Sequence, residues 1–272
     1  MNKKLALIGG VLSAKFDRTF NRVYDQSSLK GFVIFIGFAR SGSTLAGSIV
    51  NAHPDALVSV ELNVMRYLLP VVSRTHLYSL IARNEKHFTE AGNEWTDYSY
   101  DISGASQGKV RDLRIIGDKK AAATTKLLAE RPELLDRLSL LTGLPVKVVH
   151  VVRNPFDVIA TQRKRGSREL DYSVDNYVGR VMQLNQVVSR IPSEDLLSLK
   201  HDKLLSESSE TIRNLFEFLE LSCEDSVVNA CASVIDAKPN KSRLEADWST
   251  ENLAKIERVI DQIQFLDGYS FE

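Results

Sequence analysis

Residues 37–44 (GFARSGST) combine two glycines with several hydrogen-bond donors in one short segment. They follow the apolar run 31–37 and precede residues 44–52, whose pattern predicts a helix. A glycine-bracketed turn between a buried strand and a helix brings backbone N–H groups together, and the helix N-terminus adds partial positive charge. The segment therefore predicts a binding site for an anion such as a phosphate group. A plain connecting turn is the alternative.

One residue of this segment departs from the loop that binds nucleoside triphosphates. Gly37, Gly42 and Thr44 have the spacing of G-x-x-x-x-G-K-[ST], but Ser43 stands where that motif has its lysine. Arg40 offers a positive charge three residues earlier. The segment thus keeps the anion cradle and lacks the feature most typical of triphosphate chemistry. The sequence shows no metal-ligand cluster either, so we expect no bound metal.

A second candidate anion site follows the apolar run 146–152 (VKVVHVV). Arg153 comes directly after this predicted strand, and the carboxyl ends of parallel strands are where open α/β sheets bind ligands. Asn154 suits the N-cap of the next helix and Pro155 its first position, while Asp157 can return a capping-box-like bond. The segment predicts either an exposed arginine beside a well-capped helix or an arginine that binds an anion.

The elements that must position these residues alternate along the chain. The predicted strands are residues 31–37, 58–61, part of 114–120, 146–152 and 196–201. Helical patterns separate them, which favours an α/β fold with a mostly parallel central sheet flanked by helices. Residues 89–112 are polar and of mixed pattern, which indicates a loop or lid with some helix. No linker marks a boundary, so we predict a single domain over residues 1–272.

Residues 1–30 are predicted to form an N-terminal extension. Apolar residues recur at helical spacing from Leu5 to Val23, which favours an amphipathic helix. A short signal peptide at residues 1–14 is the alternative, because two lysines precede an apolar stretch. We favour the helix, and with it a cytoplasmic protein. No stretch reaches the roughly 20 apolar residues of a membrane span, so no integral span is expected.

The composition excludes a strong overall electrostatic field. Lys+Arg and Asp+Glu both number 35, so the formal net charge is zero, and we expect no nucleic-acid partner. Any anion must be recognised locally. Cys223 and Cys231 lie eight residues apart in a segment that reads as helix, which is about 12 Å and too far for a disulfide. Two unpaired thiols fit a reducing compartment.

Two motifs together resemble a known family. R-S-G-[ST]-T after a first strand, followed by R-N-P-x-D-x-x-x-[ST] after a later one, is similar to the sulfotransferases that use 3′-phosphoadenosine 5′-phosphosulfate (PAPS) and have a P-loop-like three-layer fold. The resemblance implies that the first motif holds the 5′-phosphosulfate and that Arg153 and Thr161 hold the 3′-phosphate. The residues implied for the 5′ end are Arg40, Ser41, Gly42, Ser43 and Thr44.

Three further segments carry the resemblance. Residues 51–61 (NAHPDALVSVE) look like the tyrosylprotein and carbohydrate branch, in which the acidic residue at the position of Glu61 is the catalytic base. GDKK (117–120) resembles G-[ED]-K-[TS]-P, whose lysine contacts the transferring group; this implies Lys119, with Lys120 as a competitor. Residues 238–248 resemble a donor-binding loop and imply roles for Lys238 and Arg243.

Several residues have a second interpretation. Glu61 could instead cap a helix predicted at residues 62–69. Aromatic side chains could line an acceptor pocket or simply pack in the core, and a basic cluster near the end of the predicted helix could bind an anionic acceptor or be solvated. The aromatic residues are Trp95, Tyr98, Tyr100, Tyr172 and Trp248, and the basic ones are Arg163, Lys164, Arg165 and Arg168. Ala39 and Ala121 replace prolines of the family, which affects geometry rather than chemistry.

We therefore predict an enzyme that transfers a sulfuryl group from PAPS to an acceptor hydroxyl, leaving 3′-phosphoadenosine 5′-phosphate (PAP). Arg40 and Lys119 would stabilise the transferring group and Glu61 would act as general base. The acceptor could be a carbohydrate, peptide, lipid or small metabolite, and the sequence does not distinguish these or the oligomeric state. The alternatives are a P-loop kinase or nucleotide hydrolase, and a non-catalytic nucleotide-binding protein of the same fold.

Overall fold

The computed structural model describes residues 24–70, 72–95, 98–236 and 240–272. The predicted helix within residues 1–30 and the alternative signal peptide at 1–14 fall on residues 1–23, outside the described part, and so does Lys238. Residues 26–28 form a short 3₁₀ turn that leads into the first strand. No helix among the described residues is long and apolar enough to cross a membrane.

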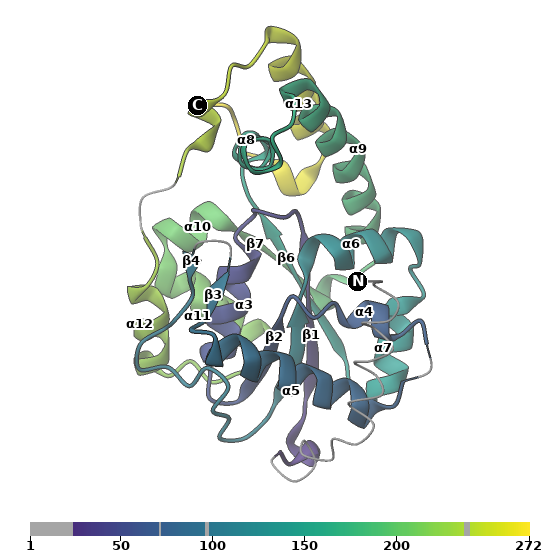
Figure 1. Cartoon of the computed structure of the whole chain (residues 1–272), viewed down its shortest axis with the longest axis vertical. Coiled ribbons are helices and arrows are strands. Elements are labelled where there is room, and N and C mark those ends of the chain that lie inside the picture. Colours follow the sequence, from purple (N-terminus) through teal and green to yellow (C-terminus); the bar gives the residue numbers. More distant parts are fainter. Residues whose placement is uncertain (1–23, 71, 96–97, 237–239) are drawn as a thin grey trace.

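The centre of the molecule is a parallel sheet of five strands, as predicted. The order across the sheet is β2-β5-β1-β6-β7 (Figure 1). The strands are β1 (Gly31–Gly37), β2 (Ala56–Val60), β5 (Ile115–Lys119), β6 (Val146–Val152) and β7 (Leu196–Lys200). Because all five run in one direction, the residues that follow them meet at a single edge of the sheet.

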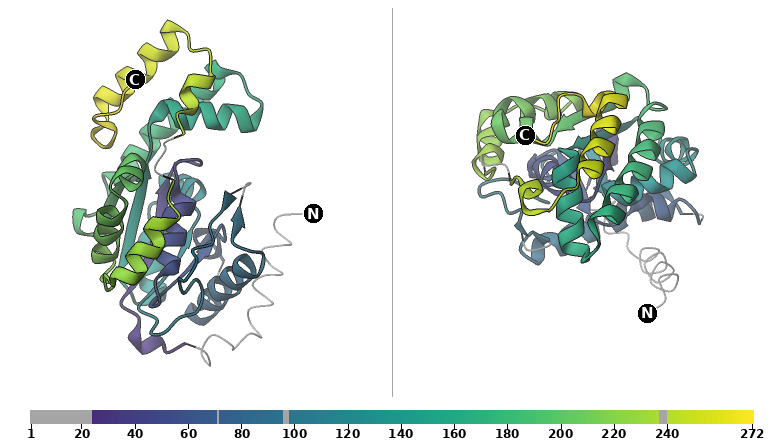
Figure 2. Two further views of the ribbon diagram at one scale, coloured as in Figure 1. Left: turned by 90° about the vertical axis from the view of Figure 1, so that its left-hand side faces the viewer. Right: turned by 90° about the horizontal axis from the view of Figure 1, so that it is seen from above.

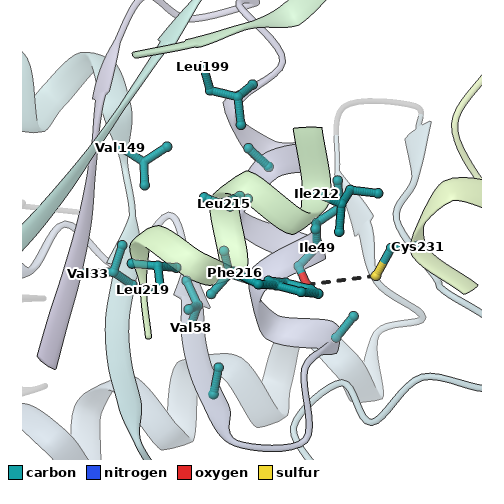
Figure 3. Close-up of a cluster of buried hydrophobic side chains, with 14 of the residues drawn as sticks. Val33, Ile49, Val58, Val149, Leu199, Ile212, Leu215, Phe216, Leu219 and Cys231 are labelled. Carbon is teal, nitrogen blue, oxygen red and sulfur yellow. Dashed lines mark hydrogen bonds between the residues drawn. The ribbon is translucent and has the colours of Figure 1, made fainter. Parts of the chain in front are cut away.

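Helices cover both faces of this sheet. One face carries α3 (Ser43–Ala52), α10 (His201–Ser206), α11 (Ser208–Phe218) and α12 (Asp225–Ser233). The other carries α4 (Val64–Tyr67), α5 (Arg74–Glu90), α6 (Ala121–Glu130), α7 (Leu134–Thr142) and α9 (Leu170–Val188). Every residue of β1 is buried, because alternate side chains enter the two cores: Phe32 and Ile34 one, Val33 and Phe35 the other. Figure 3 shows the second core.

A third group of helices lies beyond the carboxyl ends of the strands. It consists of α8 (Pro155–Gly166), the first half of α9, α13 (Thr250–Gln262) and the C-terminal segment, and it has its own apolar core (Figures 1 and 2). Asn154 and Pro155 begin α8 as predicted, with the Asn154 side chain accepting a hydrogen bond from the N–H of Phe156. This layer therefore stands over the edge at which the loops converge.

Two local predictions were wrong. Asp157 does not form a capping box; its carboxylate is buried and accepts hydrogen bonds from the backbone and the guanidinium of Arg243. Cys223 and Cys231 do not share a helix, because Cys223 lies between α11 and α12 while Cys231 is buried within α12; both are free thiols. The polar stretch predicted as a loop or lid contains a small antiparallel hairpin, β3 (Glu94–Trp95) and β4 (Tyr98–Ser99).

Candidate active site

A cavity of about 570 Å³ opens where the loops after the parallel strands meet. Residues that follow β1, β2, β5, β6 and β7 all contribute to its wall, together with the β3–β4 hairpin. The lining includes Arg40, Gly42, Ser43, Thr44, Glu61, Lys120, Arg153, Thr161 and His201 on the polar side, and Trp95, Tyr98 and Tyr100 from the hairpin. Both anion motifs of the sequence thus border one space.

The loop after β1 is a tight turn that leads into α3. Gly42 is the N-cap of α3 with φ 91°, and a Cβ there would lie 2.2 Å from Cδ2 of His201, so glycine is required. Ser41 donates to the carbonyl of Phe38 (2.8 Å), which closes the turn with its own side chain. The first N–H groups of α3 have no partner within the helix, as at any helix N-terminus. They provide the partial positive charge that an anion needs.

Two side chains hold this loop, Arg153 from the β6–α8 connection and Gln162 from α8. Arg153 donates to the carbonyl of Arg40 (3.0 Å), and Gln162 donates to the carbonyl of Ala39 (2.8 Å). The second donor group of Arg153 reaches the carbonyl of Asn240 (2.8 Å). The two sequence motifs are therefore joined directly, at the position where alanine replaces the proline of the family.

Glu61 lies directly after β2 with φ 68°. Its two carboxylate oxygens contact one ammonium group each, those of Lys119 and Lys120. Lys119 is 1% exposed and also donates to Oγ1 of Thr44 (2.8 Å), so it links the carboxylate to the anion loop. Gly47 of α3 makes room for it, since a Cβ there would lie 2.9 Å from both Cβ and Cγ of Lys119.

Asp118, rather than Glu61, caps the helix that follows β2. Asp118 is fully buried and accepts hydrogen bonds from the N–H groups of Leu62 (3.2 Å), Asn63 (2.8 Å) and Val64 (3.0 Å), at the start of α4. Its Oδ1 also accepts from Ser59 (2.7 Å). Sequence reasoning missed Asp118, although its place before Lys119 at the end of a strand could have suggested it. The Glu61 carboxylate consequently faces the two lysines.

The charge state of Glu61 follows from these neighbours. Partial burial raises the pKa of Glu61, but the two lysine ammonium groups outweigh this effect and hold its pKa below the usual value. Glu61 is therefore an anion at neutral pH. A carboxylate of this kind can accept a proton from a hydroxyl bound within hydrogen-bond reach, provided that the lysines are drawn elsewhere.

The residues expected to bind a second anion do not all line the cavity. Arg153 and Thr161 do, and the hydroxyl of Thr161 lies 2.9 Å from that of Ser242. Arg243 does not; its guanidinium pairs with Asp157 (2.7 Å) and donates to the carbonyls of the last two residues, Phe271 (2.6 Å) and Glu272 (2.9 Å). These contacts make Arg243 a residue that ties the C-terminal segment to α8.

His201 is a cavity residue that sequence reasoning did not single out. It is the first residue of α10, immediately after β7, and lies against Gly42 of the anion loop. Burial lowers the pKa of His201 to about 4, and the positive charge of Arg153 adds to the effect. The imidazole is therefore neutral at neutral pH and contacts the loop as a flat, uncharged ring. Its position at the end of the predicted strand 196–201 was the available signal.

The aromatic side chains lie in three different environments. Trp95, Tyr98 and Tyr100 line the cavity, as the acceptor-pocket interpretation requires. Trp248 instead packs edge-on against Phe156, with ring centroids 5.4 Å apart, in the core beneath α8. Tyr172 is exposed and outside the cavity wall.

The basic cluster at the end of α8 is mostly solvent-exposed, because Lys164, Arg165 and Arg168 are exposed and only Arg163 is partly buried. Lys164 pairs with Glu245 (2.8 Å), and the guanidinium of Arg165 lies 6.0 Å from the ring centre of Tyr98. Within the described part of the chain, no three His, Cys, Asp or Glu side chains gather in a way that could hold a metal ion.

Comparisons with known proteins agree with this arrangement. The model of the sulfotransferase family matches residues 33–225. The sulfotransferase domain of the curacin biosynthetic pathway has a similar fold, with 15% identity and a TM-score of 0.50, over 85% of this chain and 98% of that chain. The sulfotransferase domain of the Synechococcus PCC 7002 olefin synthase is also similar, with 15% identity and a TM-score of 0.51, over 87% and 98%.

A relative from Aquifex aeolicus (strain VF5), described as an uncharacterized protein, is 23% identical over 215 residues, or 72% of this chain. The chain spans about a quarter of the length of that relative (26%). The family match covers well over half of the chain, including both anion motifs, the position of Glu61 and the lysine pair. The chain therefore belongs to the sulfotransferase family, whose members transfer sulfate groups.

Proposed function

We propose that the chain transfers a sulfuryl group from PAPS to an acceptor hydroxyl, with Glu61 as general base. The observation that carries this proposal is the contact of Glu61 with Lys119 and Lys120 in the cavity that also contains the loop after β1. One carboxylate in reach of a hydroxyl, beside a cradle for a transferring anion, is what such a reaction needs. The sequence motifs support the same assignment.

The charge of the cavity fits the donor. PAPS carries anionic groups at both ends of its ribose, and the cavity is lined by Arg40 and Lys120 and by Arg153, whose guanidinium also contacts the carbonyl of Arg40. Lys119 adds a buried ammonium group behind the loop. The 5′-phosphosulfate would lie on the loop and the N-terminus of α3, and the 3′-phosphate would bind Arg153 with the hydroxyl of Thr161.

At sulfur, the transfer makes one bond and breaks one. The acceptor oxygen attacks sulfur, the bond between sulfur and the bridging oxygen of the 5′-phosphate breaks, and the acceptor proton passes to Glu61. PAP then leaves with the electron pair of the broken bond. Arg40 and Lys119 stabilise the charge on the transferring and leaving oxygens, which is the main catalytic effect in the related phosphoryl transfers.

The lysine pair gives Glu61 two states. Without donor, both carboxylate oxygens are neutralised by ammonium groups. A bound sulfuryl group competes for these ammonium groups, which weakens their stabilisation of the negative charge of Glu61 and makes the carboxylate a better proton acceptor. Donor binding therefore prepares the base for the acceptor.

The donor assignment is tested with PAP as the ligand in calorimetric titrations. We expect Arg40→Ala and Arg153→Ala each to weaken binding about ten- to a hundredfold, because loss of one charge-assisted contact costs about 1.5–3 kcal/mol. Arg137→Ala is the matched control, since Arg137 is exposed on α7 and away from the cavity. Unchanged affinity in both cavity variants would exclude this donor site.

A further inference from the structure

The β3–β4 hairpin presents aromatic side chains to the cavity that contains Glu61. Trp95 is 39% exposed and Tyr98 is 49% exposed, although both line the cavity. Large aromatic side chains on a two-residue strand gain only part of their burial free energy from this position in the absence of a ligand, because a large part of each residue still faces water. The hairpin is labelled in Figure 1.

The hairpin is held against the anion loop at two points. The guanidinium of Arg40 lies 5.9 Å from the ring centre of Tyr98, within the range of a cation–π contact. The side chains of Tyr100 and Thr44 are hydrogen-bonded to each other. The aromatic wall and the residues proposed to bind the sulfuryl group therefore touch directly.

Buried polar groups fix the base of the hairpin. Gln107, 7% exposed, donates to the carbonyl of Tyr100 (2.7 Å) and accepts from the N–H of Ile102 (2.9 Å). The carbonyl of Asn93 accepts from the N–H of Tyr100 (2.9 Å), and the N–H of Ser106 donates to the last residue of α3 (3.1 Å). A segment with a two-stranded hairpin is marginal by itself, so these bonds are what hold it in one position.

We propose that the hairpin is the acceptor-recognition element of the enzyme, and that Trp95 and Tyr98 select acceptors in which the reacting hydroxyl is attached to a ring. This inference rests on the proposed function, because it takes Glu61 as the base that the hydroxyl must reach. A flat ring, either aromatic or the apolar face of a sugar, gains contact with an aromatic side chain, and a flexible alkyl chain gains less. Gln107 is a positioning residue for this wall.

The first test measures acceptor binding to PAP-loaded protein. The probes are 2-naphthol for a phenol, methyl β-glucoside for a sugar and 1-hexanol for a chain alcohol, each titrated calorimetrically. We expect at least one ring probe to bind roughly tenfold more tightly than 1-hexanol. Trp95→Ala and Tyr98→Ala should each weaken the affinity for that probe about five- to tenfold. Trp95→Phe and Tyr98→Phe keep a ring and should retain most of it. The probe that binds distinguishes phenols from sugars.

Tyr172→Ala is the control, because Tyr172 is an exposed aromatic residue outside the cavity wall, packed by Arg168 (5.5 Å). PAP affinity is measured for every variant and should change less than threefold. Equal binding of ring and chain probes, or ring binding that survives both alanine substitutions, would overturn the inference while leaving the donor site in place. Failure of the wild-type protein to bind PAP would instead overturn the proposed function.

Gln107→Ala tests the positioning role separately in the transfer reaction with the ring acceptor that binds. Loss of the two hydrogen bonds loosens the wall, so we expect the acceptor KM to rise about fivefold or more while kcat changes less than twofold. An equal fall in kcat at unchanged acceptor KM would contradict this role, because it would indicate damage to the reacting groups rather than to the acceptor wall.

Discussion

Gly47 offers a sharp test of the Lys119 position, because two physical effects of Gly47→Ala oppose each other. Alanine in a helix interior is favoured over glycine by about 0.5–1 kcal/mol. Against this, the new Cβ would lie 2.9 Å from Cβ and Cγ of Lys119, and such crowding in a packed site typically costs about 1–3 kcal/mol. The lysine is 1% exposed and cannot move into solvent without leaving Thr44 and Glu61. We therefore expect a net loss of about 0–2.5 kcal/mol in the free energy of unfolding.

The assay pairs urea unfolding with the rate of sulfuryl transfer. Gly179→Ala is the matched control: Gly179 lies within α9, and a Cβ there would meet nothing within 4 Å. The free energy of unfolding of that variant should rise by about 0.5–1 kcal/mol, and its activity should not change. For Gly47→Ala we expect the transfer rate to fall at least tenfold whether or not the free energy of unfolding changes, because the ammonium group of Lys119 must shift. A Gly47→Ala protein as active as the wild type and more stable by about 1 kcal/mol would refute the reasoning.

Three further predictions concern residues around the cavity. The histidine side chain is protonated below about pH 6.5 in the unfolded chain, whereas His201 in the folded protein is protonated only near pH 4. The free energy of unfolding should therefore fall as the pH is lowered from about 6.5 toward 4. His201→Gln should flatten this pH dependence of unfolding. Arg243→Met should lower the free energy of unfolding by about 3–5 kcal/mol, because Asp157 stays buried without its partner, yet change PAP affinity less than threefold; a large loss of PAP binding would return Arg243 to the donor site. Asp118→Asn should cost about 1–3 kcal/mol in urea unfolding by weakening the cap of α4, and an unchanged midpoint would contradict the capping role.

The strands β1 and β6 could be predicted because each is a mainly apolar run between turns. The predicted α/β class with a parallel sheet is confirmed, and the ends of β1 and β6 agree with the predicted ranges 31–37 and 146–152. Burial on both faces makes such runs easy to recognise, and all their carboxyl ends lie at one edge. The family resemblance is confirmed too, whereas membership of the tyrosylprotein and carbohydrate branch stays a prediction.

Long-range contacts account for what the sequence could not predict. The sequence suggested that Asp157 closes a local capping box, but its carboxylate instead pairs with the guanidinium of Arg243, 86 residues later. A charge-assisted hydrogen bond of this kind is stronger than one from a neutral backbone N–H group. Glu61 was ambiguous between a cap and a base; Asp118 caps α4 from a different strand, while the role of Glu61 as base stays a prediction. The hairpin escaped prediction because its two-residue strands carry no periodic pattern.

The central claim is that Glu61 takes the acceptor proton during transfer from PAPS. The most direct measurement is a single turnover with sulfur-labelled PAPS bound in excess protein, started by adding the ring acceptor that binds, in the wild type and in Glu61→Gln. The account predicts that Glu61→Gln binds PAP with an affinity within threefold of the wild type and transfers label at least a hundredfold more slowly, the usual magnitude for loss of a general base. Transfer by Glu61→Gln at the wild-type rate would contradict the account, because another group would then have to accept the proton.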